Sequence, residues 1–194
     1  MSSPTITGVI LAGGRASRLG GVDKGLITLA GKPLVEHVIL RLAPQVETLV
    51  INANRHLADY AAYGFPVVED SSKDYLGPLA GILSALRFVE TDYILTVPCD
   101  LPFIPMNLCE RLLNSFEEEK VELCAAHDGV QIQPLVTLLS CKMEKSIATY
   151  LEQGGRKVEM WVREQYFSVA DFSDCPGDFV NINTPEDLAA AGKV

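Results

Sequence analysis

The sequence predicts a single α/β domain, residues 1–194, in which a mostly parallel sheet lies between two helical layers in an α/β/α arrangement. Helical and strand patterns alternate along the chain, which is typical of parallel strands joined by helices. The segment 93–97 is almost wholly apolar, as expected for a strand that is buried on both faces. No internal repeat or linker interrupts the pattern, so one domain is favoured over two.

The first half of the chain contains four strand patterns, each followed by turn or polar residues. They cover residues 6–11, 48–51, 65–68 and 93–97. Between them lie three helical patterns, identified by apolar residues at the spacing of a buried helix face. These helices begin near residue 33, extend from 56 to 63, and begin at 77–78. Gly64 closes the second of them in the manner of a helix C-cap.

The second half is less regular. The expected elements are a helix over about 106–119, strands over 123–126, 134–139 and 167–169, and a helix over 144–153. Residues 158–163 fit neither pattern clearly. A last helix is expected to begin after Thr184, because threonine is a good N-cap and Pro185, Glu186 and Asp187 suit a first turn.

Composition excludes several classes of protein. The formal net charge of −9 argues against a nucleic-acid-binding surface, which gains its affinity by neutralising phosphates. The five cysteines are odd in number, widely spaced and free of C-x-x-C pairs, so they predict reduced thiols and no zinc site. No apolar run reaches the ~18 residues of a membrane span and no signal peptide is evident, so we expect a soluble, cytoplasmic protein without membrane partners.

The first strand leads directly into a segment rich in glycine and positive charge, residues 10–25, ILAGGRASRLGGVDKG. Its spacing fits neither the G-x-G-x-x-G dinucleotide motif nor the G-x-x-x-x-G-K-[ST] phosphate loop. Gly13 and Gly14 let the backbone approach a bulky anion, and the loop amides can donate to it. Arg18 and Lys24 add charge-assisted contacts. The segment therefore predicts a binding loop for a nucleoside triphosphate.

Three polar residues follow the ends of other predicted strands. Asn52, Asp70 and Asp100 each lie at the carboxyl end of a strand, and in a parallel sheet these ends form one ligand-binding edge. A triphosphate beside acidic residues implies Mg²⁺, which is held by one or two carboxylates together with phosphates and water. Asp100 is the best candidate, because Pro98 and Pro102 restrict the backbone around it. The alternative is a turn aspartate with no metal role.

The segment 11–25 also resembles the signature of nucleotidyltransferases with the glycosyltransferase-A-like fold. Its spacing, with Gly20-Gly21 and Asp23-Lys24-Gly25 after Arg18, is most similar to that of the molybdenum cofactor guanylyltransferases. The similarity continues along nearly the whole chain, through residues 31–34, 52–55, 69–70, 77–81, 98–100 and 180–185. Sugar-nucleotide pyrophosphorylases share the general signature but usually carry a further domain. The resemblance implies a Rossmann-like sheet of the nucleotide-diphospho-sugar transferase type.

The resemblance further implies that GMP is transferred from GTP to molybdenum-molybdopterin, giving the molybdopterin guanine dinucleotide cofactor and pyrophosphate. The N-terminal half would bind the nucleotide and the C-terminal half the acceptor. The matching GTP-binding positions are Leu11, Ala12, Gly13, Lys24, Asn52, Asp70 and Asp100, to which the loop argument adds Gly14. The position of Asp100 would also hold Mg²⁺, and Asn181 and Asn183 match positions on the pterin side. Molybdoenzyme apoproteins or their chaperones are the implied protein partners.

The expected mechanism is electrostatic. A phosphate monoester is already an oxyanion near neutral pH, so catalysis is assigned to Arg18, Lys24 and Asp100 with Mg²⁺, and to no general base. Two alternatives stay open: cytidylyl transfer to the same pterin, and a non-catalytic GTP-binding carrier of the cofactor. Arg156 and Lys157 either grip the pterin phosphate or are solvated surface charges.

Overall fold

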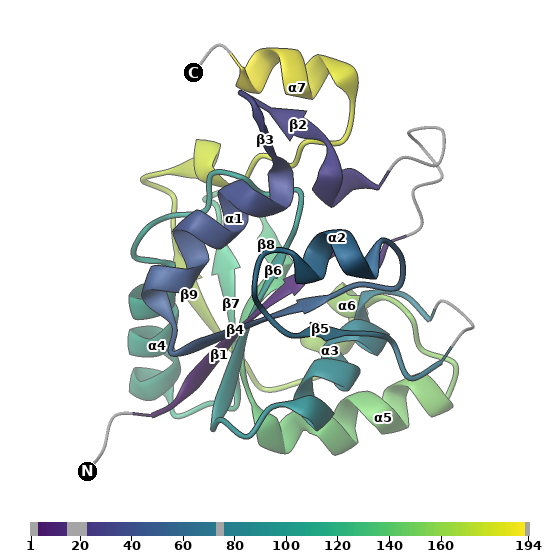
Figure 1. Ribbon diagram of the computed structural model, residues 1–194. Helices are drawn as coiled ribbons and strands as arrows, with labels where there is room; N and C mark the ends of the chain where they lie inside the picture. Colours follow the sequence, from purple (N-terminus) through teal and green to yellow (C-terminus); the bar gives the residue numbers. More distant parts are fainter. Residues whose placement is uncertain (1–3, 15–22, 73–75, 193–194) are drawn as a thin grey trace.

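The computed structural model describes residues 4–14, 23–72 and 76–192, and in it a twisted sheet lies between two layers of helices (Figure 1). The strands, in order across the sheet, are β5 (Val67–Val68), β4 (Thr48–Asn52), β1 (Ile6–Leu11), β6 (Tyr93–Pro98), β8 (Ile132–Ser140), β7 (Leu123–His127) and β9 (Ser168–Asp171). All neighbouring pairs are parallel except those made by β8, which is antiparallel to β6 and β7. The predicted mostly parallel sheet is confirmed.

Three of the described helices cover each face of the sheet, and each face has its own core. One layer contains α1 (Leu34–Leu42), α2 (Leu57–Ala61) and α4 (Leu108–Glu119); the other contains α3 (Pro78–Phe88), α5 (Glu144–Glu152) and α6 (Val158–Arg163). Side chains along β1 alternate between the two cores, because successive residues of a strand point to opposite faces. Ile10 therefore packs with α1 and α4, and Val9 packs with α3 and α5.

A short hairpin and the last helix form a third, smaller cluster at one end of the sheet. The hairpin strands β2 (Thr28–Leu29) and β3 (Lys32–Pro33) lie beside α7 (Pro185–Ala191), where Leu29, Leu34 and Ile182 are buried together (Figure 1). The hairpin turn places Ala30 at φ 49° and Gly31 at φ 84°, as a two-residue turn with both φ angles positive requires. This hairpin was not among the predicted elements.

Short 3₁₀ turns complete the chain: η1 (Lys24–Leu26), η2 (Ala43–Gln45), η3 (Cys141–Met143) and η4 (Pro176–Phe179). Several predicted boundaries need correction. The helix expected over 56–63 is the shorter α2, the strand expected over 65–68 is reduced to β5, and the unassigned residues 158–163 form α6. The last helix begins as predicted, since the Thr184 hydroxyl accepts the Asp187 N–H at 3.1 Å and the Asp187 carboxylate accepts the Thr184 N–H at 2.9 Å.

Two expectations from composition can be compared with the structure. All five cysteines are free thiols, and three of them are buried. Among the described residues, no helix combines the length and the apolar character that crossing a membrane requires.

Candidate functional site

A cavity of about 420 Å³ opens at the carboxyl ends of β1, β4 and β6, where the sequence places the candidate ligand-binding edge. Its walls contain eight residues predicted as binding positions: Leu11, Ala12, Gly13, Gly14, Lys24, Asn52, Asp70 and Asp100. Asn181 also lines the cavity. Arg18, the remaining predicted catalytic residue, lies outside the described residues. These nine residues come from six separate segments of the chain and border one space.

Asp100 is the centre of a polar cluster on one side of the cavity. Its side chain is only 12% exposed, and its Oδ2 accepts a hydrogen bond from Lys24 Nζ at 3.2 Å. Its Oδ1 accepts from Asn181 Nδ2 at 3.2 Å, while its main-chain carbonyl accepts from the Ile182 N–H at 2.9 Å. Lys24 Nζ also donates to Asn183 Oδ1 at 2.5 Å. Of the two asparagines expected on the acceptor side, Asn181 therefore contacts Asp100 and Asn183 contacts Lys24.

A second cluster surrounds Asp70 on the opposite side of the glycine loop. Asn52 Nδ2 donates to Asp70 Oδ1 and Asn54 Nδ2 donates to Asp70 Oδ2, both at 2.9 Å. The Asp70 N–H in turn donates a hydrogen bond to Asn54 Oδ1 at 2.8 Å. An ionised carboxylate has about four acceptor sites, so Asp70 retains acceptor capacity toward the cavity.

Asn54 was not among the site residues predicted from the sequence, although its spacing from Asn52 indicated a role. It lies two residues beyond Asn52, and alternate residues of an extended segment point to the same side. The spacing therefore predicts that both amides reach the same neighbour. That neighbour is Asp70, which follows the adjacent strand β5.

Asn52 is held tightly between two glycines. Its side chain is buried, and its Oδ1 lies only 2.1 Å from the position that a Cβ on Gly81 of α3 would occupy. A Cβ on Gly13 would lie 3.0 Å from the same oxygen. The absence of a side chain at Gly81 thus lets α3 approach the end of β4 closely enough to enclose the amide.

We expect Gly81→Ala to lower the free energy of unfolding by about 1–3 kcal/mol, the usual cost of overpacking. Helix propensity alone predicts the opposite, a gain of about 1 kcal/mol for alanine in a helix. Urea denaturation of the two proteins distinguishes the two effects. Gly177→Ala is the matched control, because a Cβ at Gly177 would meet no atom of the described residues within 4 Å. A Gly81→Ala protein more stable than wild type would contradict this account of Asn52.

The buried carboxylate of Asp23 fixes the backbone next to Lys24. Asp23 is 5% exposed, and its Oδ1 accepts the Gly25 N–H at 3.1 Å and the Tyr60 hydroxyl at 2.5 Å. Cys99, which also borders the cavity, is buried, and this burial raises the pKa of its thiol well above the ordinary value. A thiol that stays neutral is a poor nucleophile, so the structure favours a packing role for Cys99.

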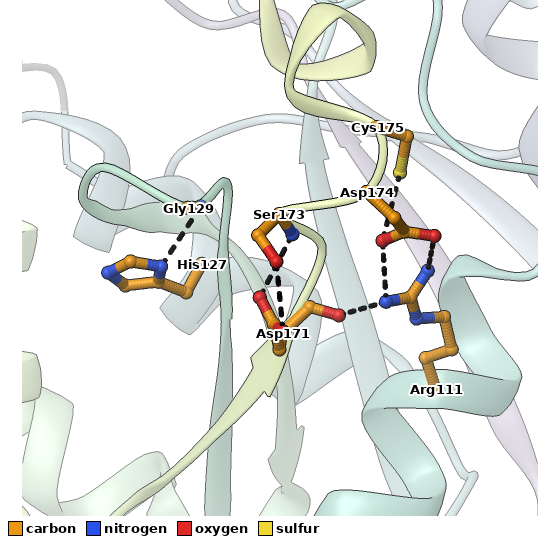
Figure 2. A network of polar contacts seen from close by, with 7 residues as sticks. All are labelled: Arg111, His127, Gly129, Asp171, Ser173, Asp174 and Cys175. Carbon is orange, nitrogen blue, oxygen red and sulfur yellow. Dashed lines mark hydrogen bonds and ion pairs between the residues drawn. The ribbon is translucent and has the colours of Figure 1, made fainter.

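Arg111 of α4 anchors residues 171–174, from which the chain continues to Asn181 and Asn183 (Figure 2). The Arg111 guanidinium donates to both carboxylate oxygens of Asp174, at 2.9 and 3.0 Å, and to the Asp171 carbonyl. It also lies 4.2 Å from the centre of the Phe172 ring. From this anchor the chain passes through η4 and returns to the cavity.

Arg156 and Lys157 are exposed, and neither is among the described residues that line the cavity. The Arg156 guanidinium donates to the carbonyl oxygens of Leu151 and Gly155, at 2.8 and 2.5 Å, at the end of α5. A basic side chain bound to the last carbonyls of a helix is a common stabilising arrangement. The geometry of Arg156 therefore fits a surface role better than a grip on the pterin phosphate.

The cavity combines groups suited to anions and to cations. Gly77 and Pro78, at the N-terminus of α3, form part of its wall, and a helix N-terminus favours negative charge. Lys24 adds a positive charge, and the carboxylates of Asp70 and Asp100 supply hard oxygen donors. Such a site can bind a phosphorylated ligand together with a divalent cation.

The chain matches the MobA-like NTP transferase domain over residues 8–168. A protein named molybdenum cofactor guanylyltransferase from Shewanella sp. (strain W3-18-1) is 47% identical over 184 residues, which cover 95% of this chain and 94% of that protein. A protein of the same name from Shewanella sp. (strain ANA-3) is 48% identical over 181 residues, which cover 93% and 92%.

Solved structures show the same fold. Molybdopterin-guanine dinucleotide biosynthesis protein A from Archaeoglobus fulgidus aligns with a TM-score of 0.80 at 23% identity, covering 96% of this chain and 97% of that chain. A 4-diphosphocytidyl-2C-methyl-D-erythritol synthase from Anaerococcus prevotii aligns with a TM-score of 0.75 at 12% identity, covering 98% and 95%. These likenesses confirm the predicted fold class.

Proposed function

The chain belongs to the MobA-like NTP transferase family, and from this premise we propose that it transfers GMP from GTP to the terminal phosphate of molybdenum-molybdopterin, releasing pyrophosphate. It is a nucleotidyltransferase, and relatives about 47% identical over almost their full length are named guanylyltransferases. The observation that carries the proposal is the cluster of Lys24, Asp100 and Asn183 beside the glycine-lined cavity.

On the nucleotide side, we assign the triphosphate to Gly13, Gly14 and Lys24. Among the described residues that line the cavity, Lys24 alone carries a positive charge, so it is the natural partner of a phosphate there. We assign the guanine base to the cluster of Asp70 and Asn52. Guanine presents two adjacent N–H donors that suit a carboxylate, whereas cytosine presents an acceptor beside its amino group.

Magnesium fits the donor set at Asp100. Within residues 4–14, 23–72 and 76–192, no group of three or more His, Cys, Asp or Glu side chains could hold a metal ion by itself. Mg²⁺ suits such a site, because it takes few protein carboxylates and completes its shell with substrate phosphates and water. Asp100 would hold the ion, which when bound would offset the negative charge of the transferring phosphoryl group.

The protein's own residues would promote transfer by positioning and charge. The acceptor phosphate is already an oxyanion and needs no general base, so Lys24 Nζ would donate to the phosphoryl oxygens as charge moves to the leaving pyrophosphate. Asn181 and Asn183 would orient the acceptor, since both contact the Lys24–Asp100 pair. The neutral, buried Cys99 supports direct displacement over a covalent enzyme intermediate.

The two ligands would bind to different parts of the chain. Residues 11–100 bear the nucleotide contacts, and residues 181–183 bear the acceptor contacts. We place the enzyme in the cytoplasm, where its five free thiols would stay reduced.

We expect the protein to bind GTP more tightly than CTP or ATP in the presence of Mg²⁺, because of the acceptor pair on Asp70. Calorimetric titration with each nucleotide measures the difference. Pyrophosphate release, measured with each nucleotide and with or without molybdopterin, then tests transfer. Equal or tighter binding of CTP would favour a cytidylyltransferase, and GTP binding without release of pyrophosphate would favour a carrier.

A further inference from the structure

The buried side chain of Tyr60 contacts the segment that carries Lys24. Tyr60 belongs to α2 and has no exposed surface, although it carries a polar hydroxyl. The hydroxyl donates a hydrogen bond to Asp23 Oδ1 at 2.5 Å. Because Asp23 precedes Lys24, this bond ties α2 to the segment that carries the ammonium group.

The residue after Lys24 is fixed by the same contact. Asp23 Oδ1 also accepts the Gly25 N–H at 3.1 Å. A Cβ on Gly25 would lie only 2.4 Å from the Tyr60 hydroxyl oxygen, so the hydroxyl occupies space that a side chain at position 25 would need. The backbone is therefore held on both sides of Lys24 by one carboxylate and one hydroxyl.

We propose that Tyr60 is a positioning residue for Lys24 in the proposed transfer reaction. The lysine side chain is flexible and 28% exposed, so the place of its ammonium depends on how firmly its backbone is held. The inference rests on the proposed function, in which Lys24 acts on the phosphoryl group. Tyr60 itself is buried away from the substrate and would act only through Asp23 and Gly25.

The hydroxyl is suited to a permanent structural bond. Burial, together with the nearby Cys99 and Asp23, raises the pKa of Tyr60 above its ordinary value. The raised pKa keeps the hydroxyl protonated, so it remains a donor near neutral pH.

The first test is Tyr60→Phe, which keeps the ring in the core and removes only the hydroxyl. We expect kcat for GMP transfer to fall roughly tenfold, because small misplacements of a catalytic group are costly. The KM for GTP should stay within about threefold, since contacts that bind the ground state are retained. Tyr63→Phe is the control, because Tyr63 is close in sequence but partly exposed. A Tyr60→Phe kcat within about twofold of wild type would overturn the proposal.

A double-mutant cycle separates positioning from general destabilisation. In a Lys24→Ala background, Tyr60→Phe should change kcat by less than about twofold, because no ammonium remains to be misplaced. Equal loss in both backgrounds would show that Tyr60 merely supports the fold, and would overturn the proposal. Gly25→Ala provides a second variant. It should lower kcat by displacing the hydroxyl, and Tyr60→Phe should relieve part of that loss.

Amide hydrogen exchange gives a readout that does not depend on activity. In the Tyr60→Phe protein, the amides of residues 24–26 should exchange faster than in wild type, while those of α3 should not change. Unaltered exchange at residues 24–26 would overturn the positioning role. Failure of the wild-type enzyme to transfer GMP would instead overturn the proposed function, and the exchange experiment would still decide whether Tyr60 holds this segment.

Discussion

Asp100→Asn is expected to abolish GMP transfer while the fold stays intact. The substitution keeps the volume but removes the negative charge that a hard cation requires. It also disturbs the cluster, because both Asp100 oxygens accept hydrogen bonds, from Lys24 and from Asn181, whereas an amide offers only one acceptor. One of these donors would face an NH₂ group. The substitution therefore removes the charge that we assign to the metal and one of these two hydrogen bonds.

The experiment compares GMP transfer by the wild-type and Asp100→Asn proteins across a Mg²⁺ titration, with circular dichroism to confirm folding. Asp92→Asn is a matched control, because Asp92 precedes β6 at the opposite end of the same strand. If Asp100 were only a turn residue, asparagine would replace it with little loss. Activity within a few-fold of wild type at low Mg²⁺ would therefore reject the assignment of the metal to Asp100.

Lys24→Ala should lower turnover by roughly a hundredfold, or about 3 kcal/mol, the usual effect of removing one group that stabilises charge in a transition state. The effect should fall mainly on kcat, because the ammonium is assigned to charge that develops as pyrophosphate leaves. Removing it also leaves Asp100 and Asn183 without their shared partner.

Steady-state kinetics with GTP and molybdopterin distinguish the two possible effects of this substitution. Lys32→Ala is the control, since Lys32 is half exposed and, within the described part of the chain, pairs only with Glu36, at 2.9 Å on the surface. A Lys24→Ala enzyme with normal kcat and a raised KM would mean that Lys24 binds the ground state and the transition state equally.

The main architecture could be predicted from the sequence because it depends on periodicity. Apolar runs and helical stripes identified the strands of the large sheet and the helices α1 to α5, and the capping residues after Thr184 marked the last helix. The hairpin of β2 and β3 was missed because its strands have two residues each and its turn uses Ala30, which rarely adopts positive φ. The helix over 158–163 was ambiguous because it has only six residues and is stabilised by burial of Trp161 and Val162.

The cavity could be anticipated because the carboxyl ends of parallel strands meet at one edge. That rule brought Asn52, Asp70 and Asp100 together with the glycine loop, and the structure places these three residues, with Gly13 and Gly14, around one cavity. The supporting contacts could not be anticipated, because they depend on packing between residues distant in sequence. Tyr60 is an ordinary buried aromatic residue in the sequence, and only its distance to Asp23 shows a further role.

The bond between Lys24 and Asn183 joins residues that are 159 positions apart. Contacts over such separations carry a large loop-closure cost and are favoured only after much of the chain is already ordered. The site would therefore be completed late in folding, when residues 181–183 return across the finished sheet to reach Asp100. An incompletely folded chain would lack these contacts, so full activity would itself be a measure of complete folding.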